Sequence, residues 1–271
     1  MQHSRHTPEQ IPQGLGVGKD VETLHLATQQ SVVPRPMRYR DIPTVYDTTR
    51  RASIDDPLNR FLKYYPESTR RFDMRSPAQK AVMYLSFVSE VRERVSWTAN
   101  RGESYLRIGD PLHETGILTK LIERVVGFLM GLLLTSEQKT RRAEWARKLE
   151  EATRAALGDG PTRMVELTSV ATAPERQGHG YASTLVRIVT ALADGRGVGS
   201  WLVSSNVANR GFYATFGYTV ARTFDLGGED PTWTLPPVPI DIMVREPVGV
   251  GEKQKAHSLA EAQGSLGGVL L

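Results

Sequence analysis

The residues with the clearest chemical potential lie in the segment QGHGYA, from Gln177 to Ala182. Its two glycines let the backbone approach a bulky group closely. Apolar residues recur at helical spacing from Ala182 onwards and predict a helix that begins there. The first amide groups of any helix have no hydrogen-bond partner inside it. Together with the helix dipole, these amides predict an anion site, most simply for phosphate. The pattern matches neither G-x-G-x-x-G nor the Walker sequence, and a glycine-rich connection that only saves space is the alternative.

The elements on either side of this segment would position it. Residues 165–172 are rich in β-branched types, which indicates a strand buried on both sides. One predicted face carries Val165, Leu167, Ser169 and Ala171, and the other carries Val170 and Thr172. Pro174 ends the strand pattern, and the following helix is expected to stop before the glycines of residues 195–199. The sequence therefore predicts a strand, a glycine turn and a helix.

This segment resembles the acyl-CoA-binding signature of the GNAT family of N-acetyltransferases, Q/R-x-x-G-x-G/A. The signature is met by Gln177, Gly180 and Ala182. The resemblance implies that the turn holds the pyrophosphate of coenzyme A through backbone amides of Gln177, Gly178, His179, Gly180, Tyr181 and Ala182. It also implies that the preceding strand splays from its neighbour and bonds to the pantetheine arm through Val170 and Thr172, whose amides suit the polarisation of a thioester carbonyl.

A second segment supports the resemblance. Residues 200–205 read as a strand, and residues 206–218 are similar to the family element N-x-x-x-x-x-x-Y-x-x-x-G-F/Y. The resemblance places Asn206 and Asn209 near the cofactor, although Asn206 also suits a turn at a strand end. It places Tyr213 where many members hold the tyrosine that protonates the departing thiolate. A core aromatic residue is the alternative for Tyr213, whereas a phenol is a plausible donor because its pKa lies near that of a thiol.

Glu166 is the candidate general base. It lies eleven positions before Gln177, as does the catalytic glutamate in the histone-acetylating branch of the family. Partial burial in a strand centre would raise its pKa towards a value useful for taking a proton from an amine. A water chain, another residue, or a purely structural role for Glu166 are the alternatives.

The resemblance implies an α/β (α+β) GNAT fold. Its central sheet is mixed and mostly antiparallel, with a splayed strand pair, flanking helices and a helical insertion before the fourth strand. Sequence patterns predict strands at residues 32–39, 95–99, 104–108, 219–226 and 238–244, and helices at 42–52, 57–64, 77–95 and within 117–157. Asp41 is a candidate cap for the first helix.

The acceptor cleft is harder to read. In the GNAT arrangement the first helices form one of its walls, and candidate contacts are Arg50, Arg51, Asp55, Asp56, Tyr64 and Tyr65, with His113 and Glu114 on a later loop. A solvated helix face is the simpler interpretation for most of them. The sequence therefore leaves the identity of the acceptor and the length of the acyl chain open.

Composition sets the domain organisation. The chain has 271 residues, 39% hydrophobic and 24% charged, as expected for one globular domain with tails. We predict a disordered arm at 1–31, a GNAT domain at 32–247 with a helical insertion at 117–157, and a disordered tail at 248–271. A core cover, a substrate lid and a dimer surface are alternatives for the insertion. The ending at 241–247, together with the insertion, resembles fungal single-domain GNAT proteins.

Charge and cysteine content exclude several classes. The net charge of +4, with charges of both signs intermixed, says little about nucleic acid. No nucleic-acid partner is expected, because the sequence has no basic stripe and no DNA-binding motif. The absence of cysteine excludes disulfides, thiolate metal sites and a cysteine nucleophile. His3, His6 and His25 lack metal-ligand spacing, so no metal is expected. The most apolar window, residues 125–134, is too short for a membrane span. A cytoplasmic protein is expected, with the nucleus as an alternative.

These features predict an acetyl-CoA-dependent N-acetyltransferase that transfers the acetyl group directly to a primary amine of a small molecule. The alternatives are a protein lysine or N-terminal acetyltransferase and a non-catalytic acyl-CoA-binding regulator. A monomer and a homodimer are both compatible with the sequence.

Overall fold

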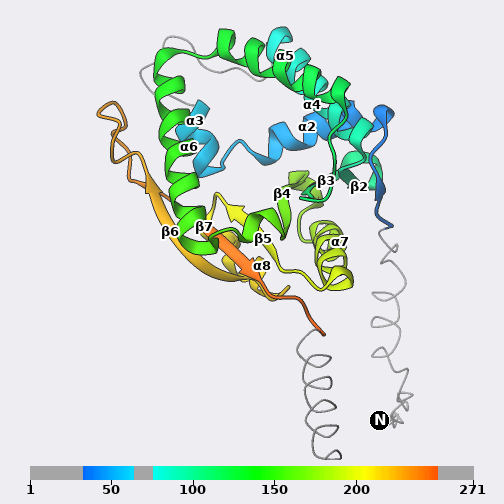
Figure 1. Cartoon of the computed structure of the whole chain (residues 1–271). Coiled ribbons are helices and arrows are strands. Elements are labelled where there is room, and N and C mark those ends of the chain that lie inside the picture. Colours follow the sequence, from blue (N-terminus) through cyan, green and yellow to red (C-terminus); the bar gives the residue numbers. More distant parts are fainter. Residues whose placement is uncertain (1–32, 64–75, 250–271) are drawn as a thin grey trace, which may run out of the picture. The chain divides into compact units, whose positions relative to one another are not determined.

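The computed structural model describes residues 33–63 and 76–249, and its centre is a seven-stranded sheet (Figure 1). The order across the sheet is β1-β2-β3-β4-β5-β7-β6, and β4 and β5 form its parallel pair. The strands are β1 Arg35–Pro36, β2 Ser96–Ala99, β3 Ser104–Gly109, β4 Val165–Thr172, β5 Ser200–Ser204, β6 Thr219–Leu226 and β7 Val238–Arg245. The mixed, mostly antiparallel sheet that the sequence predicts is confirmed.

Seven α-helices accompany the sheet within these ranges. They are α2 Ile42–Ala52, α3 Pro57–Lys63, α4 Pro77–Glu93, α5 Ile117–Leu133, α6 Ser136–Leu157, α7 Tyr181–Arg196 and α8 Arg210–Ala214. The cap-and-proline start of α4 is as expected, because the Ser76 hydroxyl accepts a hydrogen bond from the Gln79 amide at 3.2 Å. Helices α5 and α6 lie in the range predicted for the insertion.

Apolar clusters join the helices to the sheet, and two of them involve the helices that cover the candidate site. In the first, Val45 of α2 and Phe87 of α4 pack with Tyr105 of β3. In the second, Phe61 of α3 packs with Ile240 of β7 and with partly buried aromatic residues of α6 and β6. The first cluster lies at the β3 side of the sheet and the second at the β7 and β6 side. Strands β4 and β5 therefore lie between the two clusters.

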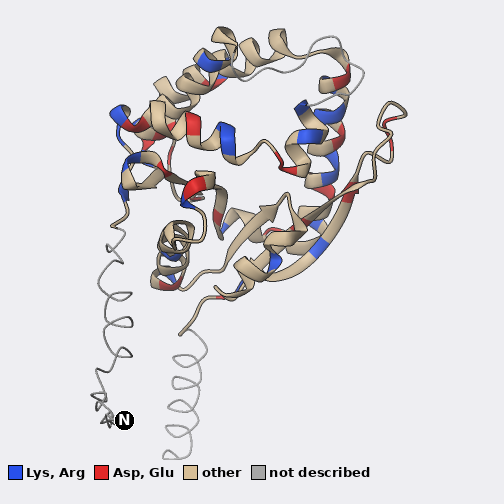
Figure 2. Ribbon diagram, turned by 180° about the vertical axis from the view of Figure 1, so that it is seen from behind, with Lys and Arg blue, Asp and Glu red and all other residues tan. Residues whose placement is uncertain are grey.

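Helix α6 is fixed to the sheet by charge as well as by apolar contact. Its Arg141 side chain is buried and bonds to Asp230, in the connection between β6 and β7, at 2.6 Å. Charges of both signs are mixed along the rest of this helix (Figure 2), including the pair of Lys148 with Glu144. The pair of Arg141 with Asp230 holds the connection after β6 against α6.

The strand pair β4–β5 separates part of the way along. The two strands are in register from Val165 opposite Ser200 to Leu167 opposite Leu202. Beyond Leu167, β4 stays paired with β3, while β5 stays paired with β7 as far as Ser204 opposite Asp241. The predicted splayed strand pair is therefore present, and it opens at the end of β4 that leads into the glycine turn.

Three local predictions need correction. Asp41 does not cap α2 through its side chain, because its carboxylate accepts hydrogen bonds from Arg35 at 2.7 and 2.8 Å and from the Arg38 amide. Helix α7 runs through Gly195 and ends at Arg196, and Gly197, which has a positive φ, caps it. The first strand spans Arg35–Pro36, shorter than predicted. The expected arm at 1–31, residues 250–271 of the tail, and Tyr64 and Tyr65 lie outside the described residues.

Candidate active site

The glycine turn presents a set of unpaired backbone donors. After the short helical turn Pro174–Arg176, Gly178 and Gly180 adopt φ angles of 77° and 79°, which favour glycine, and α7 begins at Tyr181. Within the part of the chain that the structure describes, the amides of residues 178–183 have no acceptor. Six unpaired donors at a helix start are the kind of group that an anion site uses, so the anion site remains a prediction.

The space in front of these donors is open. A Cβ atom added to Gly178 or Gly180 would meet no atom within 4 Å. A hollow of about 490 Å³, here called the turn hollow, lies there and is lined by Gln177, Gly178, Gly180, Tyr181, Ala182 and neighbouring residues. His179 does not line it. Its ring is exposed, and its Nδ1 atom lies 2.8 Å from the Gln177 carbonyl oxygen.

A β-bulge aims the amides of β4. The Val165 amide donates to Gly199, on the β5 side, whereas the Ala173 amide donates to Glu103, on the β3 side. Because amides alternate along a strand and these residues are eight positions apart, both would point the same way in a regular strand. Thr168 has no partner in the pairing of β4 with β3, and this extra residue reverses which amides of β4 point towards β3.

The amides of Val170 and Thr172 consequently face the gap between β4 and β5. This is the direction in which the resemblance requires them to point. The same bulge interrupts the side-chain alternation, so the single face predicted from Val165 to Ala171 is wrong. The sequence pattern gives no signal for a bulge at Thr168.

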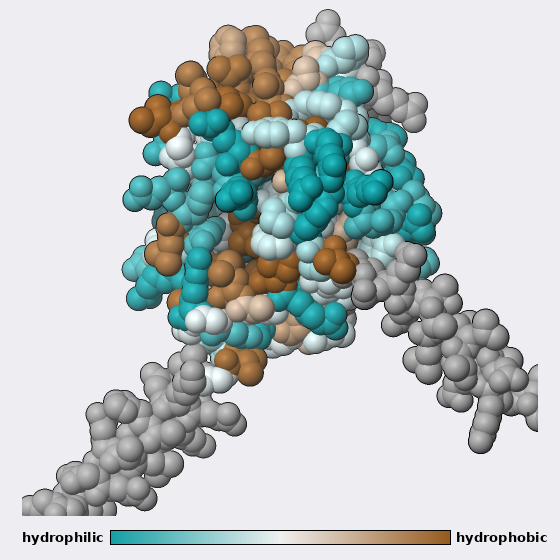
Figure 3. Space-filling model, turned by 90° about the vertical axis from the view of Figure 1, so that its right-hand side faces the viewer, coloured by the Kyte–Doolittle hydropathy of each residue, from teal (hydrophilic) through white to brown (hydrophobic). Residues whose placement is uncertain are grey.

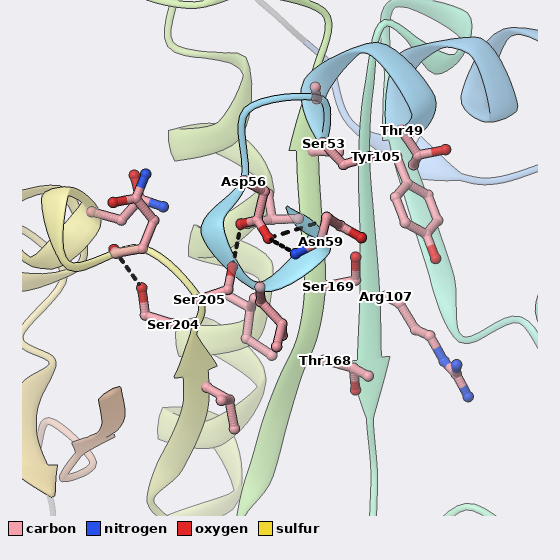
Figure 4. Close-up of a pocket in the computed structure, with 18 of the residues that line it drawn as sticks. Thr49, Ser53, Asp56, Asn59, Tyr105, Arg107, Thr168, Ser169, Ser204 and Ser205 are labelled. Atoms are coloured by element: carbon pink, nitrogen blue, oxygen red, sulfur yellow. Dashed lines mark hydrogen bonds between the residues drawn. The ribbon is translucent and has the colours of Figure 1, made fainter. Parts of the chain in front are cut away.

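A second, larger hollow of about 870 Å³ lies on the side of the sheet that α2, α3 and α4 cover, and it is here called the helix hollow (Figure 4). Side chains from α2, α3, α4, α6 and the strands β3, β4 and β5 line it. Six residues line both hollows: Val170, Ala171, Thr172, Gln177, Asn209 and Tyr213. The two hollows therefore meet at the gap between the splayed strands.

Tyr213 lies at this junction. The residue is 6% exposed, and its ring packs edge-on against Phe212 and Tyr218. Burial, with smaller contributions from Tyr218 and Asp56, raises the pKa of its phenol. No group among residues 33–63 and 76–249 forms a hydrogen bond with its hydroxyl. The raised pKa keeps the phenol protonated but removes the match to a thiol pKa that the sequence suggested. Its position beside two open spaces is therefore what makes Tyr213 a candidate donor to an atom in the gap.

Glu166 lines the helix hollow without a hydrogen-bond partner in the described chain. Burial raises the pKa of its carboxyl group, and the nearby Arg107 guanidinium opposes that shift. The residue opposite on β3 is Gly109, where an added Cβ would come within 2.8 Å of the Glu166 carboxylate. A larger residue at position 109 would therefore displace the Glu166 carboxylate from its present place.

Asp56 organises the rim of the helix hollow. Its carboxylate accepts hydrogen bonds from the Asn59 amide at 2.8 Å, and from the hydroxyl of Ser205, just past the end of β5 (Figure 4). Asp56 therefore caps α3 and also ties that helix to the end of a splayed strand. The sequence identified Asp55 and Asp56 as candidates, and both line the hollow.

Other predicted contacts lie elsewhere. Arg51 forms a bidentate pair with Glu175 in the turn before Gln177, at 2.7 and 2.9 Å, and Arg50 pairs with Asp47. His113 pairs with Glu93 at 2.9 Å, outside both hollows. Neither hollow is lined by Arg50, Arg51, His113 or Glu114.

The two predicted asparagines differ. Asn209 lines both hollows, whereas Asn206 lines the helix hollow and also accepts a hydrogen bond from the Ala208 amide at 3.0 Å. The turn role that was the alternative for Asn206 is therefore present beside its position in the hollow.

The sequence did not identify several polar residues of the helix hollow. Glu90 of α4 is buried and accepts hydrogen bonds from Tyr105 and Ser96, with Arg107 at 3.9 Å. Burial, with Glu90 close by, raises the pKa of Tyr105. Lys63 also lines the hollow, and burial and Arg142 lower its pKa to about 8, against the effect of Asp56. These residues come from separate elements, and no local pattern joins them.

Comparison with known proteins agrees with this geometry. Residues 86–218 match the model of the acetyltransferase (GNAT) family. Among solved structures, arylalkylamine N-acetyltransferase 2 from Aedes aegypti is similar with a TM-score of 0.53 and 16% identity, over 80% of this chain and 99% of that one. A phosphinothricin acetyltransferase from Sinorhizobium meliloti, in complex with acetyl-CoA, has a TM-score of 0.47 and 12% identity, over 82% and 92%. No curated protein sequence matches the chain.

Residues 86–218 match a GNAT acetyltransferase domain, and the fold is that of an N-acetyltransferase. Members of this family use acetyl-CoA. No helix in the described ranges is long and apolar enough to span a bilayer, and no cluster of potential metal ligands occurs in them.

Proposed function

We propose that the protein transfers the acetyl group of acetyl-CoA directly to a primary amine of a small molecule. The observation that carries the proposal is the junction of two hollows at Tyr213, one beside unpaired turn amides and one beside a half-buried carboxylate. An acyl donor and an amine acceptor that enter from opposite sides would meet there. Holding two reactants in line supplies roughly 7–11 kcal/mol of barrier reduction at best.

The residues of the turn hollow fit the diphosphate of coenzyme A. The amides of 178–183 are free of protein acceptors, and the open space at Gly178 and Gly180 lets an anion approach them. Val170 and Thr172 present amides along the gap, where they would hold the pantetheine arm and polarise the thioester carbonyl. When bound, the cofactor supplies an activated acetyl group.

Glu166 and Tyr213 divide the proton transfers. Glu166 takes a proton from the acceptor ammonium, because a carboxyl group with a raised pKa is a stronger base than an exposed one. The neutral amine attacks the thioester carbonyl, so the C–N bond forms and the C–S bond breaks. Tyr213 gives its proton to the departing thiolate, and the proton that the acylated nitrogen then loses passes to the Tyr213 phenolate, which leaves a neutral amide and a free thiol. The chain has no cysteine, which agrees with direct transfer.

The charge of the helix hollow supports a cationic acceptor. Its lining includes four carboxylate residues, Asp55, Asp56, Glu90 and Glu166, against two basic residues, Lys63 and Arg107. An excess of carboxylates in a partly enclosed cleft attracts an ammonium group and raises its local concentration. Glu166 then takes a proton from this ammonium group, which leaves a neutral amine that can attack the thioester.

We also propose that the GNAT domain spans residues 32–247, with α5 and α6 as its helical insertion, and that the enzyme is cytoplasmic. We further propose that the protein is similar to fungal single-domain GNAT proteins, because residues 241–247 and the insertion resemble them.

Thiol release tests the function. The protein is incubated with acetyl-CoA and a panel of monoamines, diamines and lysine peptides, and free thiol is followed with a chromogenic thiol reagent. Because the chain has no cysteine, the reagent reads coenzyme A alone. We expect thiol release that depends on a small amine. Release with peptides only would indicate a protein acetyltransferase, and tight cofactor binding without release would indicate a regulator.

A further inference from the structure

Helix α5 exposes a continuous apolar stripe that the acyltransferase site does not use. Its side chains are 44% to 88% exposed, and Figure 3 shows apolar surface gathered where α5 lies. The stripe consists of Ile117, Leu118, Leu121, Val125, Phe128 and Leu132. Only Thr119 of this helix is buried, on the side where α5 packs against α4. Monomeric proteins rarely leave an apolar surface of this size uncovered.

The spacing of the stripe is that of a helix–helix seam. From Leu118 to Leu132 the members follow at intervals of three, four, three and four positions. This alternation keeps apolar side chains facing a partner helix when the two helices coil slightly around each other. A helix of 17 residues is about 25 Å long, which is enough for four such layers.

The stripe is also complementary to itself. Leu118 and Phe128 lie five positions on either side of residue 123, and Leu121 and Val125 lie two positions on either side. A two-fold axis at this point therefore places Leu118 against Phe128 of a second copy and Leu121 against its Val125. Identical patches that meet across a two-fold axis are the usual form of a homodimer interface.

The area is sufficient for a dimer. With roughly 200 Å² for a fully exposed large side chain, the stripe offers roughly 700 Å² per copy. A standard interface takes about 800 Å² from each partner, and the flanks of the helices supply the difference. A membrane surface fits less well, because the exposed charges of α5 are Lys120, Glu123 and Arg124, of mixed sign, rather than a cationic face.

We propose that α5 is the interface of a homodimer in which two copies of this helix pack antiparallel through this stripe. The dimer does not depend on the proposed acyl transfer, and each copy retains its own pair of hollows. Of the three roles that the sequence leaves open for residues 117–157, this proposal favours the dimer surface over the core cover and the substrate lid.

Sedimentation and light scattering of the full chain across a wide concentration range test the proposal. We expect a dimer for the wild type, at least 100-fold weaker association for Leu121→Glu with Phe128→Glu, and an unchanged dimer for the control Leu235→Glu. Leu235 is also exposed but lies between β6 and β7, away from the stripe. Because all changed side chains are exposed, thermal unfolding of the variants should stay cooperative.

A wild type that is monomeric at every concentration would overturn the proposal, and so would a double variant that stays dimeric. In the first case, sedimentation with phosphatidylcholine vesicles and removal of residues 250–271 would distinguish a lipid surface from a segment of this chain as the occupant of the stripe.

Cysteine pairing tests the antiparallel arrangement on a background free of native thiols. Leu118→Cys mixed with Phe128→Cys should form a mixed disulfide under mild oxidation. Leu118→Cys alone should not cross-link, because two copies of position 118 would lie about 15 Å apart along the seam. Efficient cross-linking of Leu118→Cys with itself would contradict the antiparallel pairing.

Discussion

The turn hollow and the helix hollow differ in how they are built. The turn hollow depends on backbone amides and two glycines within residues 177–183. The helix hollow depends on side chains from five helices and three strands, and on hydrogen bonds such as that of Asp56 with Ser205, 149 residues apart. A backbone site needs only a local conformation, whereas a side-chain site needs the whole fold to be in place.

This difference explains what each hollow recognises. Backbone donors bind any diphosphate of the right geometry, so one short pattern can serve a constant cofactor. Side chains set charge and shape, so the helix hollow determines which amine is accepted. We therefore expect changes in the turn to affect cofactor affinity, changes in the helix hollow to affect the acceptor, and changes at the junction to affect the chemical step alone.

Tyr213→Phe should have the largest effect. It removes the proton donor at the junction, so kcat should fall by about 1000-fold while the Kd for coenzyme A stays within twofold. Steady-state kinetics and calorimetry measure the two quantities. Tyr218→Phe, which removes a hydroxyl from the neighbouring buried ring, is the matched control with near-normal kcat. A Tyr213→Phe enzyme with wild-type turnover would reduce Tyr213 to a core residue.

Gly180→Val should act on the cofactor. A side chain there would occupy the open space before the amides, and the φ angle of 79° strains any β-branched residue. Loss of about 3 kcal/mol of charge-assisted hydrogen bonding corresponds to roughly 150-fold weaker coenzyme A binding by calorimetry. Gly195→Ala, in the same helix and also facing open space, is the control with unchanged affinity. Equal affinity in both variants would show that the turn does not hold the cofactor.

Glu166→Gln should lower kcat in a pH-dependent way. At about pH 6 the acceptor is protonated and needs the base, so a loss of about 100-fold is expected, and it should narrow at about pH 9, where free amine is abundant. The pH–rate profile measures this effect. A loss that is the same at every pH would point to a structural role for the carboxylate.

The same substitution should raise stability. A carboxyl group whose pKa is raised by burial binds its proton more tightly in the folded chain than in the unfolded one. Its stabilising contribution is present below the unfolded-state pKa and is lost as the pH rises through the folded-state pKa. Glu166→Gln should therefore have a higher Tm than the wild type near pH 7, and the difference should shrink near pH 4.

Arg51→Ala should have the smallest effect. Arg51 of α2 pairs with Glu175 just before the turn, so it joins the two regions. Arg51 lowers the pKa of Glu175 to about 2, so the pair persists across the working pH range. We expect a KM for acetyl-CoA about threefold higher at low salt, and a smaller difference at high salt, because the pair is exposed. Arg154→Ala, which breaks an exposed pair within α6, is the control. An equal change in both would show that the link has no specific role.

The same contrast separates what the sequence predicts from what it does not. The turn and α7 follow from local signals: two glycines, a periodicity change near residue 180, and a proline at the strand end. The splayed strand pair was expected only from the resemblance to the GNAT family. The bulge at Thr168 has no such signal, because it results from pairing with β3, and it reverses the direction of the amides that matter.

The acceptor side shows the limit most clearly. Asp56 was identified because the resemblance places the first helices along the acceptor cleft, but its bond to Ser205 depends on the approach of α3 to the end of β5. Arg107 and Glu90 were not identified, since a charged residue in a strand or a helix usually faces solvent. Arg51 was expected to face an acceptor but instead bonds to Glu175, because long-range ion pairs cannot be read from one helix.

A crystal structure with coenzyme A tests the central claim most directly. The account predicts diphosphate oxygens about 2.7–3.2 Å from amide nitrogens of residues 178–183, the pantetheine arm between β4 and β5, and the sulfur beside the Tyr213 hydroxyl. Coenzyme A bound elsewhere, with those amides facing solvent and the gap between the strands empty, would contradict it.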